Sequence, residues 1–183
     1  KECSKEKEAI KEKITTINKE VDAYQKNIIN TYENKTVGKI LRAILPVEIP
    51  EDITAENDSL LQIKKYYYSR EHYFDNINLS DPTLLYTNVL QQKVDFYLNK
   101  VLPQIPDTLT TEAIALIEKA SHDTLTFQNM TSQLLNFSIK SKIMGMDKLL
   151  LAIAENYYLS GRAYWADSTL LADLEKEVKK IIL

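Results

Sequence analysis

The densest group of side chains that could carry chemistry lies in the segment 66–81, where Glu71-His72 is followed closely by Asp75. If residues 59–77 form one helix, Glu71 and Asp75 are i,i+4 neighbours and His72 and Asp75 are an i,i+3 pair. Three potential metal ligands then share about one turn. A metal site also needs further ligands and outer hydrogen-bond partners, and the second histidine lies in another segment. A solvated or hydrogen-bonded His72 is therefore favoured, and a stand-alone metal-binding or enzymatic protein using Glu71, His72 and Asp75 is kept as the alternative.

Other kinds of catalytic centre find no support in the sequence. Cys3 lies next to the start of the chain, and no serine stands in a glycine-flanked turn of the nucleophile-elbow type. The three glycines (Gly38, Gly145 and Gly161) are too scattered to form a phosphate-binding loop. We therefore expect no catalytic residue, no metal and no cofactor, and a protein that is not an enzyme.

Composition narrows the class of protein further. The chain has 183 residues, 44% hydrophobic and 27% charged, which is typical of one globular domain. Its net charge is −3 and no basic stripe is present, so nucleic acid is an unexpected partner. The longest apolar run, residues 149–154, is far shorter than the roughly 20 residues that span a bilayer. We expect no transmembrane segment, and the start of the chain has no signal-peptide pattern.

Helical periodicity dominates the chain and predicts an all-α fold. Six apolar residues spaced 4, 3, 4, 3 and 4 apart predict a long amphipathic helix over residues 5–33: Ile10, Ile14, Ile17, Val21, Tyr24 and Ile28. We expect this stripe to pack on its own domain, with self-association as the weaker possibility. Similar stripes follow near residues 90–101, 127–137, 146–157 and 171–181, and each predicts one helix.

Helix starts are marked by acidic and hydroxyl residues that can cap a helix N-terminus. Asp58-Ser59, Asp107-Thr108, Asp123-Thr124 and Asp167-Ser168 each precede a periodic segment, and Asp81-Pro82 combines a cap with a proline at the first helical position. Ser59 with Gln62 also matches a capping box. The caps predict at least five helix starts.

The expected architecture is one helical domain over residues 1–183. Its parts are a long N-terminal helix (1–35), a short helix (37–45), an acidic loop (46–57) and a helical bundle (58–183). No internal repeat of 30 to 45 residues supports a solenoid, so a non-repetitive bundle of about six to eight helices is favoured.

Tyrosines give the best candidate for an interaction surface. Three consecutive helical residues span about 300° of azimuth, so Tyr66, Tyr67 and Tyr68 cannot all face one core and at least one should be exposed. Tyrosine is common at interfaces, although tyrosines that place their hydroxyls at the edge of a core are the more frequent case. The candidate interaction residues are Tyr66, Tyr67, Tyr68, His72, Tyr73, Asp75, Tyr158 and Trp165.

Five segments in order carry a family resemblance: residues 71–81, Tyr97-Leu98, residues 103–107, 141–147 and 157–165. Over about residues 37–183 the chain resembles a helical domain of unknown function that is found in envelope proteins of Bacteroidota, typically just ahead of a thioredoxin-like domain. The resemblance implies a periplasmic or envelope-associated module.

That resemblance also implies a partner: a thioredoxin-fold domain in cis or in trans, or an exported protein or peptide. The chain has no Cys-x-x-Cys and no βαβ pattern, so the downstream thioredoxin-like domain is absent from it. We expect a non-catalytic accessory or binding domain that presents substrates to a thioredoxin-fold protein.

Overall fold

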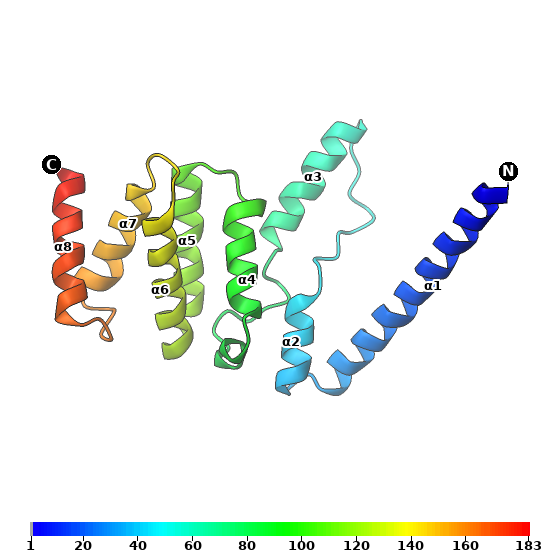
Figure 1. The fold of residues 1–183 in the computed structure, drawn as a ribbon, viewed down its shortest axis with the longest axis horizontal. Coiled ribbons are helices and arrows are strands. Elements are labelled where there is room, and N and C mark those ends of the chain that lie inside the picture. The colour runs from blue at the N-terminus through cyan, green and yellow to red at the C-terminus, as the bar shows by residue number, and fades with distance from the viewer. Residues whose placement is uncertain (1) are drawn as a thin grey trace. The chain divides into compact units, whose positions relative to one another are not determined.

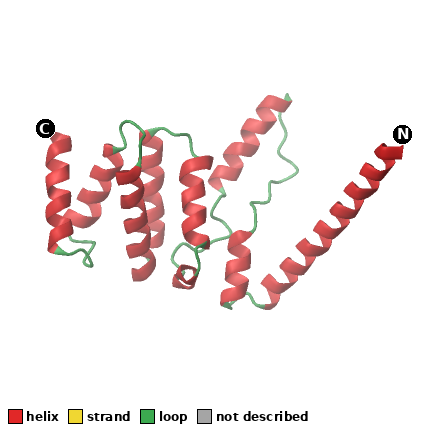
Figure 2. Cartoon of the chain, in the orientation of Figure 1, coloured by secondary structure: helices red, strands yellow, loops and turns green. Residues whose placement is uncertain are grey.

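The computed structural model describes the backbone of residues 2–183 and the side chains of residues 7, 8 and 10–183. Residues 2–183 contain eight α-helices and no strand (Figure 1, Figure 2), which confirms the predicted all-α, non-repetitive bundle of about six to eight helices. By their contacts the residues form two compact units that divide between Leu45 and Pro46. The side chain of Cys3 lies outside the described residues.

The first unit is a helical hairpin of α1 (Glu2–Thr31) and α2 (Thr36–Ile44). Gly38 permits a close approach here, because a Cβ at this position would lie 2.1 Å from the main-chain oxygen of Tyr32. The predicted stripe of α1 is exposed from Ile10 to Tyr24. Its packing on the rest of the chain and its self-association both stay predictions.

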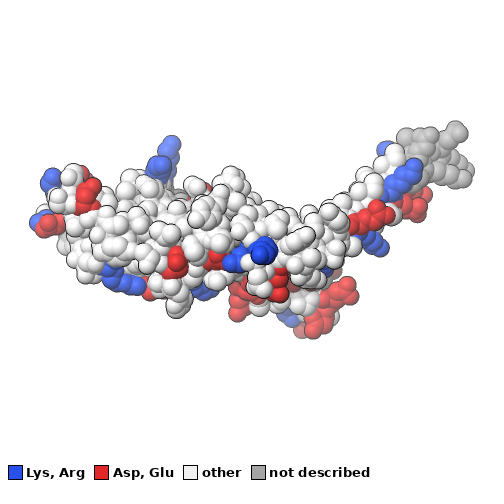
Figure 3. Space-filling model, turned by 90° about the horizontal axis from the view of Figure 1, so that it is seen from below, with Lys and Arg blue, Asp and Glu red and all other residues white. Residues whose placement is uncertain are grey.

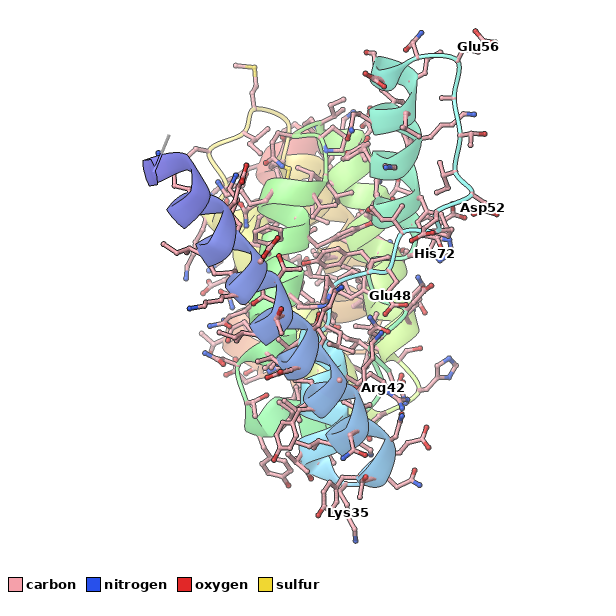
Figure 4. The ribbon with its side chains drawn as sticks, turned by 90° about the vertical axis from the view of Figure 1, so that its right-hand side faces the viewer. Lys35, Arg42, Glu48, Asp52, Glu56 and His72 are labelled. Atoms are coloured by element: carbon pink, nitrogen blue, oxygen red, sulfur yellow. The ribbon has the colours of Figure 1, made fainter. Side chains whose placement is uncertain are left out.

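The second unit begins with an extended segment, residues 46–57, that runs along α3 (Asp58–Glu71). Figure 4 marks Glu48, Asp52 and Glu56 on this segment, close in sequence to the start of α3. The Lys64 ammonium donates to the main-chain oxygen of Thr54 at 2.8 Å, and the Asn76 amide donates to that of Pro46 at 3.3 Å. These bonds hold the predicted acidic loop against α3 and against the turns that follow α3.

The remaining helices of the second unit pack around a shared apolar core. They are the 3₁₀ turn η1 (Pro82–Tyr86) and the helices α4 (Val89–Phe96), α5 (Pro106–Ala120), α6 (Thr124–Lys140), α7 (Asp147–Ile153) and α8 (Ser168–Ile182). Helix α7 contacts α5, α6 and α8. Val94, Leu98, Leu109, Ile117, Leu134, Leu149 and Ile153 are almost completely buried. Burial of these side chains is the main stabilising contribution to the unit.

Two helices continue into π-helical turns. Helix α4 runs into η2 (Tyr97–Val101), and α7 runs into η3 (Ala154–Leu159). A π turn adds a residue to the helical repeat and shifts the side chains that follow it. The stripes predicted for single α-helices over 90–101 and 146–157 therefore change register at Tyr97 and at Ala154.

Three of the predicted N-caps are confirmed. Asp123 accepts from the main-chain nitrogens of Leu125 and Thr126, both at 3.0 Å. Asp167 accepts from that of Leu170 at 2.8 Å, and Asp81 caps η1 with the predicted proline at its start.

Two predicted caps are wrong. The cap of α3 is Asn57, whose side chain accepts from Leu60 N at 2.9 Å, so Asp58 and Ser59 lie inside the helix and the capping box does not form. Helix α5 begins at Pro106, and Asp107 pairs at 2.7 Å with the Lys148 ammonium instead. Proline at the first position fixes the helix start one residue before the acidic side chain.

No helix among the described residues combines the length and apolar character that crossing a membrane requires. On the face shown in Figure 3, lysine and arginine side chains lie interspersed with acidic ones, and the described residues visible there form no continuous basic stripe.

Candidate functional site

Helix α3 ends at Glu71, six residues before the predicted end at residue 77. A series of turns follows, in which Asp75 N bonds to His72 O at 3.1 Å. Ile77 and Leu79, which follow these turns, are both buried, whereas a continuing helix would place residues two apart on opposite faces.

The three ligands of the metal hypothesis are therefore not placed on one helical turn. His72 Nδ1 lies 2.6 Å from Asp75 Oδ2, and the His72 ring stacks on Tyr68 with centroids 4.1 Å apart. Among the residues whose side chains are described, no group of three or more His, Cys, Asp and Glu side chains could hold a metal ion. His72 and Asp75 act as a hydrogen-bonded pair at the end of α3.

The last turn of α3 reaches α5 through a carboxylate. Arg70 Nη2 donates to Glu112 Oε1 at 2.7 Å, and the Tyr97 hydroxyl donates to Glu112 Oε2 at 3.0 Å. Tyr97 begins the π turn η2, and the Tyr73 and Phe74 rings pack on its ring at 5.0 and 4.9 Å. We call Arg70, Tyr97 and Glu112 the Glu112 cluster.

Burial and charge act on the ionisable groups of this cluster. Burial, together with the nearby Glu112 carboxylate, raises the pKa of Tyr97 to about 12. The hydrogen bond to Glu112 raises the pKa of Arg70. Burial also raises the pKa of the neighbouring Tyr73 hydroxyl. At neutral pH Tyr97 is therefore a proton donor and Arg70 a permanent cation.

A cavity of about 350 Å³ borders the Glu112 cluster between α3 and α5, and we call it the α3–α5 pocket. The predicted residue Tyr67 stands at its edge with 58% of its surface exposed. The pocket wall combines aromatic rings with both signs of charge: Tyr67, Arg70, Phe74, Tyr97, Glu112 and Lys119. Such a wall suits a partner side chain that has an apolar body and a polar end.

A second cluster with the same chemistry forms at Glu118, farther along α5. The Tyr157 hydroxyl donates to Glu118 Oε1 at 2.8 Å, and Arg162 donates to both carboxylate oxygens at 2.8 and 3.1 Å. The Arg162 guanidinium also lies over the Tyr157 ring at 4.8 Å and the Phe127 ring at 5.4 Å. We call Glu118, Tyr157 and Arg162 the Glu118 cluster.

The Glu118 cluster shifts the pKa values of its acidic and phenolic groups in opposite directions. The Arg162 hydrogen bonds, and then the Tyr157 bond, lower the pKa of Glu118 against the opposing effect of burial. Burial and the Glu118 carboxylate raise the pKa of Tyr157. The carboxylate therefore stays ionised and the phenol neutral, which is the arrangement that favours this hydrogen bond.

The predicted interaction residues in the 157–165 turn lie largely inside the protein. Tyr158 is 2% exposed, and Trp165 is half-buried among the rings of Phe127, Tyr158 and Tyr164. Among the described side chains, the Trp165 indole nitrogen is one of three buried polar atoms with no hydrogen-bond partner. In this conformation Tyr158 packs in the core and Tyr164 is the exposed ring of the turn.

The candidate interaction residues in and just after α3 lie in different environments. The Tyr66 hydroxyl donates to the main-chain oxygen of Val101 at 2.8 Å, Tyr67 faces the pocket, and Tyr68 stacks on His72. Tyr66 and Tyr67 are exposed, which confirms that at least one of the three tyrosines cannot face the core. Tyr73 is half-buried, and Asp75 is exposed.

Sequence reasoning missed both glutamates of α5, Glu112 and Glu118. On an amphipathic helix a carboxylate is ordinarily a solvated residue, and nothing local distinguishes these two from their neighbours. Their arginine and tyrosine partners lie far away in the sequence, at positions 70, 97, 157 and 162. The only available signal was the presence of Tyr97, Tyr157 and Arg162 in the segments that carry the family resemblance.

Comparison with known proteins places the whole described chain in one family. The family model described as "Domain of unknown function (DUF5106)" matches residues 2–183. No curated protein matches the chain, and no solved structure matches it. The chain therefore belongs to the DUF5106 family of domains of unknown function.

Proposed function

We propose that this chain is a non-catalytic helical binding domain that works with a thioredoxin-fold protein of the cell envelope, in cis or in trans. The observation that carries the proposal is the α3–α5 pocket with exposed Tyr67 at its edge. The choice of partner and compartment rests on the sequence resemblance to domains that precede thioredoxin-like domains.

The pocket is suited to one side chain of a protein partner. At about 350 Å³ it is at the small end of the range for ligand sites, which is roughly 300–1,000 Å³. Tyrosine and arginine, together with tryptophan, are the residues that most often dominate the binding energy of an interface. Arg70 is held by Glu112 before any partner arrives, so little side-chain entropy is lost on binding.

The protonation states at the pocket support binding over catalysis. With its pKa raised to about 12, Tyr97 keeps its proton at neutral pH and is a poor general base. The Glu112 carboxylate is occupied by two hydrogen bonds, from Arg70 and Tyr97. These groups can recognise a partner but are poorly matched to proton transfer.

Direct binding measurements test the proposal. Thioredoxin-fold proteins exported by the native host are assayed one at a time against the immobilised chain by biolayer interferometry. Tyr67→Ala should weaken binding by about tenfold or more, as expected for an interface residue that dominates binding. Circular dichroism should be unchanged, because Tyr67 is exposed.

Tyr86→Ala is the matched control, since Tyr86 is 87% exposed on η1 and does not line the pocket. It should bind like the unmodified chain. The proposal is wrong if no exported thioredoxin-fold protein binds, or if Tyr67→Ala and Tyr86→Ala have the same effect.

A further inference from the structure

One face of α1 is apolar and exposed over most of its length. Its side chains recur at alternating intervals of four and three residues, and each has between 46% and 67% of its surface exposed: Ile10, Ile14, Ile17, Val21 and Tyr24. Helix α2 packs at the C-terminal end of α1, where Ile29 is buried and Ile28 half-buried. A contiguous exposed apolar surface marks an interaction site. We call the five exposed residues the α1 stripe.

The spacing of the α1 stripe indicates what kind of surface covers it. Intervals of four and three residues average about 3.5, which is the repeat of a left-handed coiled coil. In the usual heptad letters, Ile14 and Val21 stand at position a, and the other three members stand at position d. The complementary surface is therefore a helix with the same repeat. A second copy of α1 has that repeat by definition.

The residues at the two ends of the stripe favour an antiparallel pair of copies. One heptad before Ile14, the exposed Lys7 stands at position a. In a parallel pair each core residue meets its own copy, so two Lys7 ammonium groups would repel each other at the interface. In an antiparallel pair a positions meet d positions, and Lys7 can lie against Tyr24 of the second copy. The lysine stem then covers the tyrosine ring, and its ammonium can make a cation–π contact.

Charged residues beside the stripe select one antiparallel register. Lys13 and Glu20 are exposed and both stand at position g, on the same edge of the stripe. In the register where Ile14 faces Ile17 of the second copy, Lys13 of each copy lies beside an oppositely charged Glu20. Sliding one helix by a heptad in either direction brings Lys13 against Lys13 or Glu20 against Glu20. Like charges at these edge positions disfavour the shifted registers.

We propose that the chain forms a symmetric antiparallel dimer through the α1 stripe. In the selected register Ile10 of each copy faces Val21 of the other, and twofold symmetry repeats every contact. Contacts between Tyr24 and Lys7 close both ends of the apolar core. Every member of the stripe and both flanking charges therefore find their complement in the same helix of a second copy. Apolar burial drives the association, and the ion pairs fix its register.

Sedimentation equilibrium of the full chain tests for the dimer. At about 100 µM, well above a micromolar dissociation constant, the chain should have twice its own mass of 21.1 kDa. Ile14→Asp places a carboxylate against Ile17 of the second copy and should leave only the monomer mass. The fluorescence of Trp165, the single tryptophan, should be unchanged in this variant because Trp165 belongs to the 46–183 unit.

A charge exchange tests the antiparallel register. Lys13→Glu should weaken dimerisation by about tenfold, because two ion pairs become two contacts between like charges. Glu20→Lys should have the same effect, and the combination of both changes should restore the original affinity. Lys19→Glu is the matched control, since it makes the same charge change at an exposed position of α1 outside the stripe and its edges. It should leave the dimer affinity unchanged.

The proposal is overturned if the chain is monomeric at about 100 µM, or if Ile14→Asp still dimerises. It is also overturned if the double charge variant does not recover the affinity lost in the single variants, because a parallel pair would place no charge opposite Lys13 or Glu20. Equal weakening by Lys13→Glu and Lys19→Glu would count against it in the same way. Tyr67→Ala should dimerise like the unmodified chain, so this result is independent of the partner measurement.

Discussion

The Glu112 and Glu118 clusters use the same three residue types in different ways. In each, a glutamate of α5 accepts from one arginine and from one tyrosine that lies in a π-helical turn. Glu118 receives three hydrogen bonds, and its arginine also lies over two aromatic rings. Glu112 receives two, and its cluster borders an open pocket.

This difference separates a structural contact from a candidate recognition site. The Glu118 cluster ties the turn after η3 back to α5, and its fully buried tyrosine meets an ion pair that is more exposed than the one between Arg70 and Glu112. The Glu112 cluster leaves part of its wall open beside Tyr67. The same ion pair therefore stabilises the fold in one place and orients a partner-facing arginine in the other.

The largest expected effect is that of removing the carboxylates. Glu118→Ala should lower the free energy of unfolding by about 2 kcal/mol, because the Tyr157 hydroxyl is left buried without an acceptor. Glu112→Ala should cost about 1 kcal/mol, since water from the α3–α5 pocket can reach Tyr97. Urea unfolding of both variants measures the difference, and equal costs would remove the distinction between the clusters.

The next effect concerns the geometry of the two arginines. Arg162→Lys should cost about 1 kcal/mol, because lysine cannot reproduce two parallel bonds to Glu118 or the stacking on the rings. Arg70→Lys should cost about 0.5 kcal/mol, because a single bond to Glu112 can be kept. Thermal unfolding followed by circular dichroism compares them, and a larger loss at position 70 would reverse the comparison.

Acid should weaken the Glu118 cluster in a defined pH window. The pKa of Glu118 is lowered from its ordinary value of 4.5, chiefly by Arg162, so the folded state holds this carboxylate ionised. Its contribution is fully present above about pH 4.5 and is lost as the pH falls through the lower folded value. The stability difference between the unmodified chain and Glu118→Gln should therefore shrink in urea titrations below that pH.

Arg162→Met serves as the control for this pH dependence. It removes the main cause of the lowered pKa, so its stability should fall less steeply with acid than that of the unmodified chain. If Arg162→Met loses stability in acid as steeply as the unmodified chain, the acid dependence comes from other carboxylates.

The smallest expected effect is at the Tyr97 hydroxyl. Tyr97→Phe should cost about 0.5 kcal/mol at neutral pH, the low end for one hydrogen bond. Because the pKa is raised from 10.0 to about 12, the contribution is fully present below pH 10.0 and is lost as the pH rises through about 12. Ultraviolet titration of tyrosinate should lose one late-titrating residue, and an unchanged curve would contradict the assignment.

The sequence predicted helix N-caps correctly where a single side chain decides the start of the helix. Asp123 and Asp167 cap their helices as predicted, since a side chain next to a helix start reaches the free N–H groups directly. The cap of α3 moved by one residue to Asn57, because asparagine caps as well as aspartate and stands first. Asp107 failed as a cap because Pro106 begins the helix and Lys148 offers an ion pair.

Of the residues around the α3–α5 pocket, only the aromatic ones of α3 were predicted from the sequence as interaction residues. Tyr67 is exposed because three consecutive tyrosines cannot share one helical face. The end of α3 at Glu71 was not predicted from local spacing, and the segment that follows it buries both Ile77 and Leu79. The metal hypothesis assumed a helix to residue 77, whereas α3 ends at Glu71.

By itself the sequence determined the helical class, several helix starts and the exposure of at least one of the α3 tyrosines, because these depend on periodicity and on neighbours within a turn. Only the tertiary structure decided which carboxylates meet which arginines. Glu112 and Glu118 have the same local pattern as solvated glutamates, and their partners come from other helices. Such contacts depend on how the helices pack and where the π turns shift the register, and no local spacing encodes them.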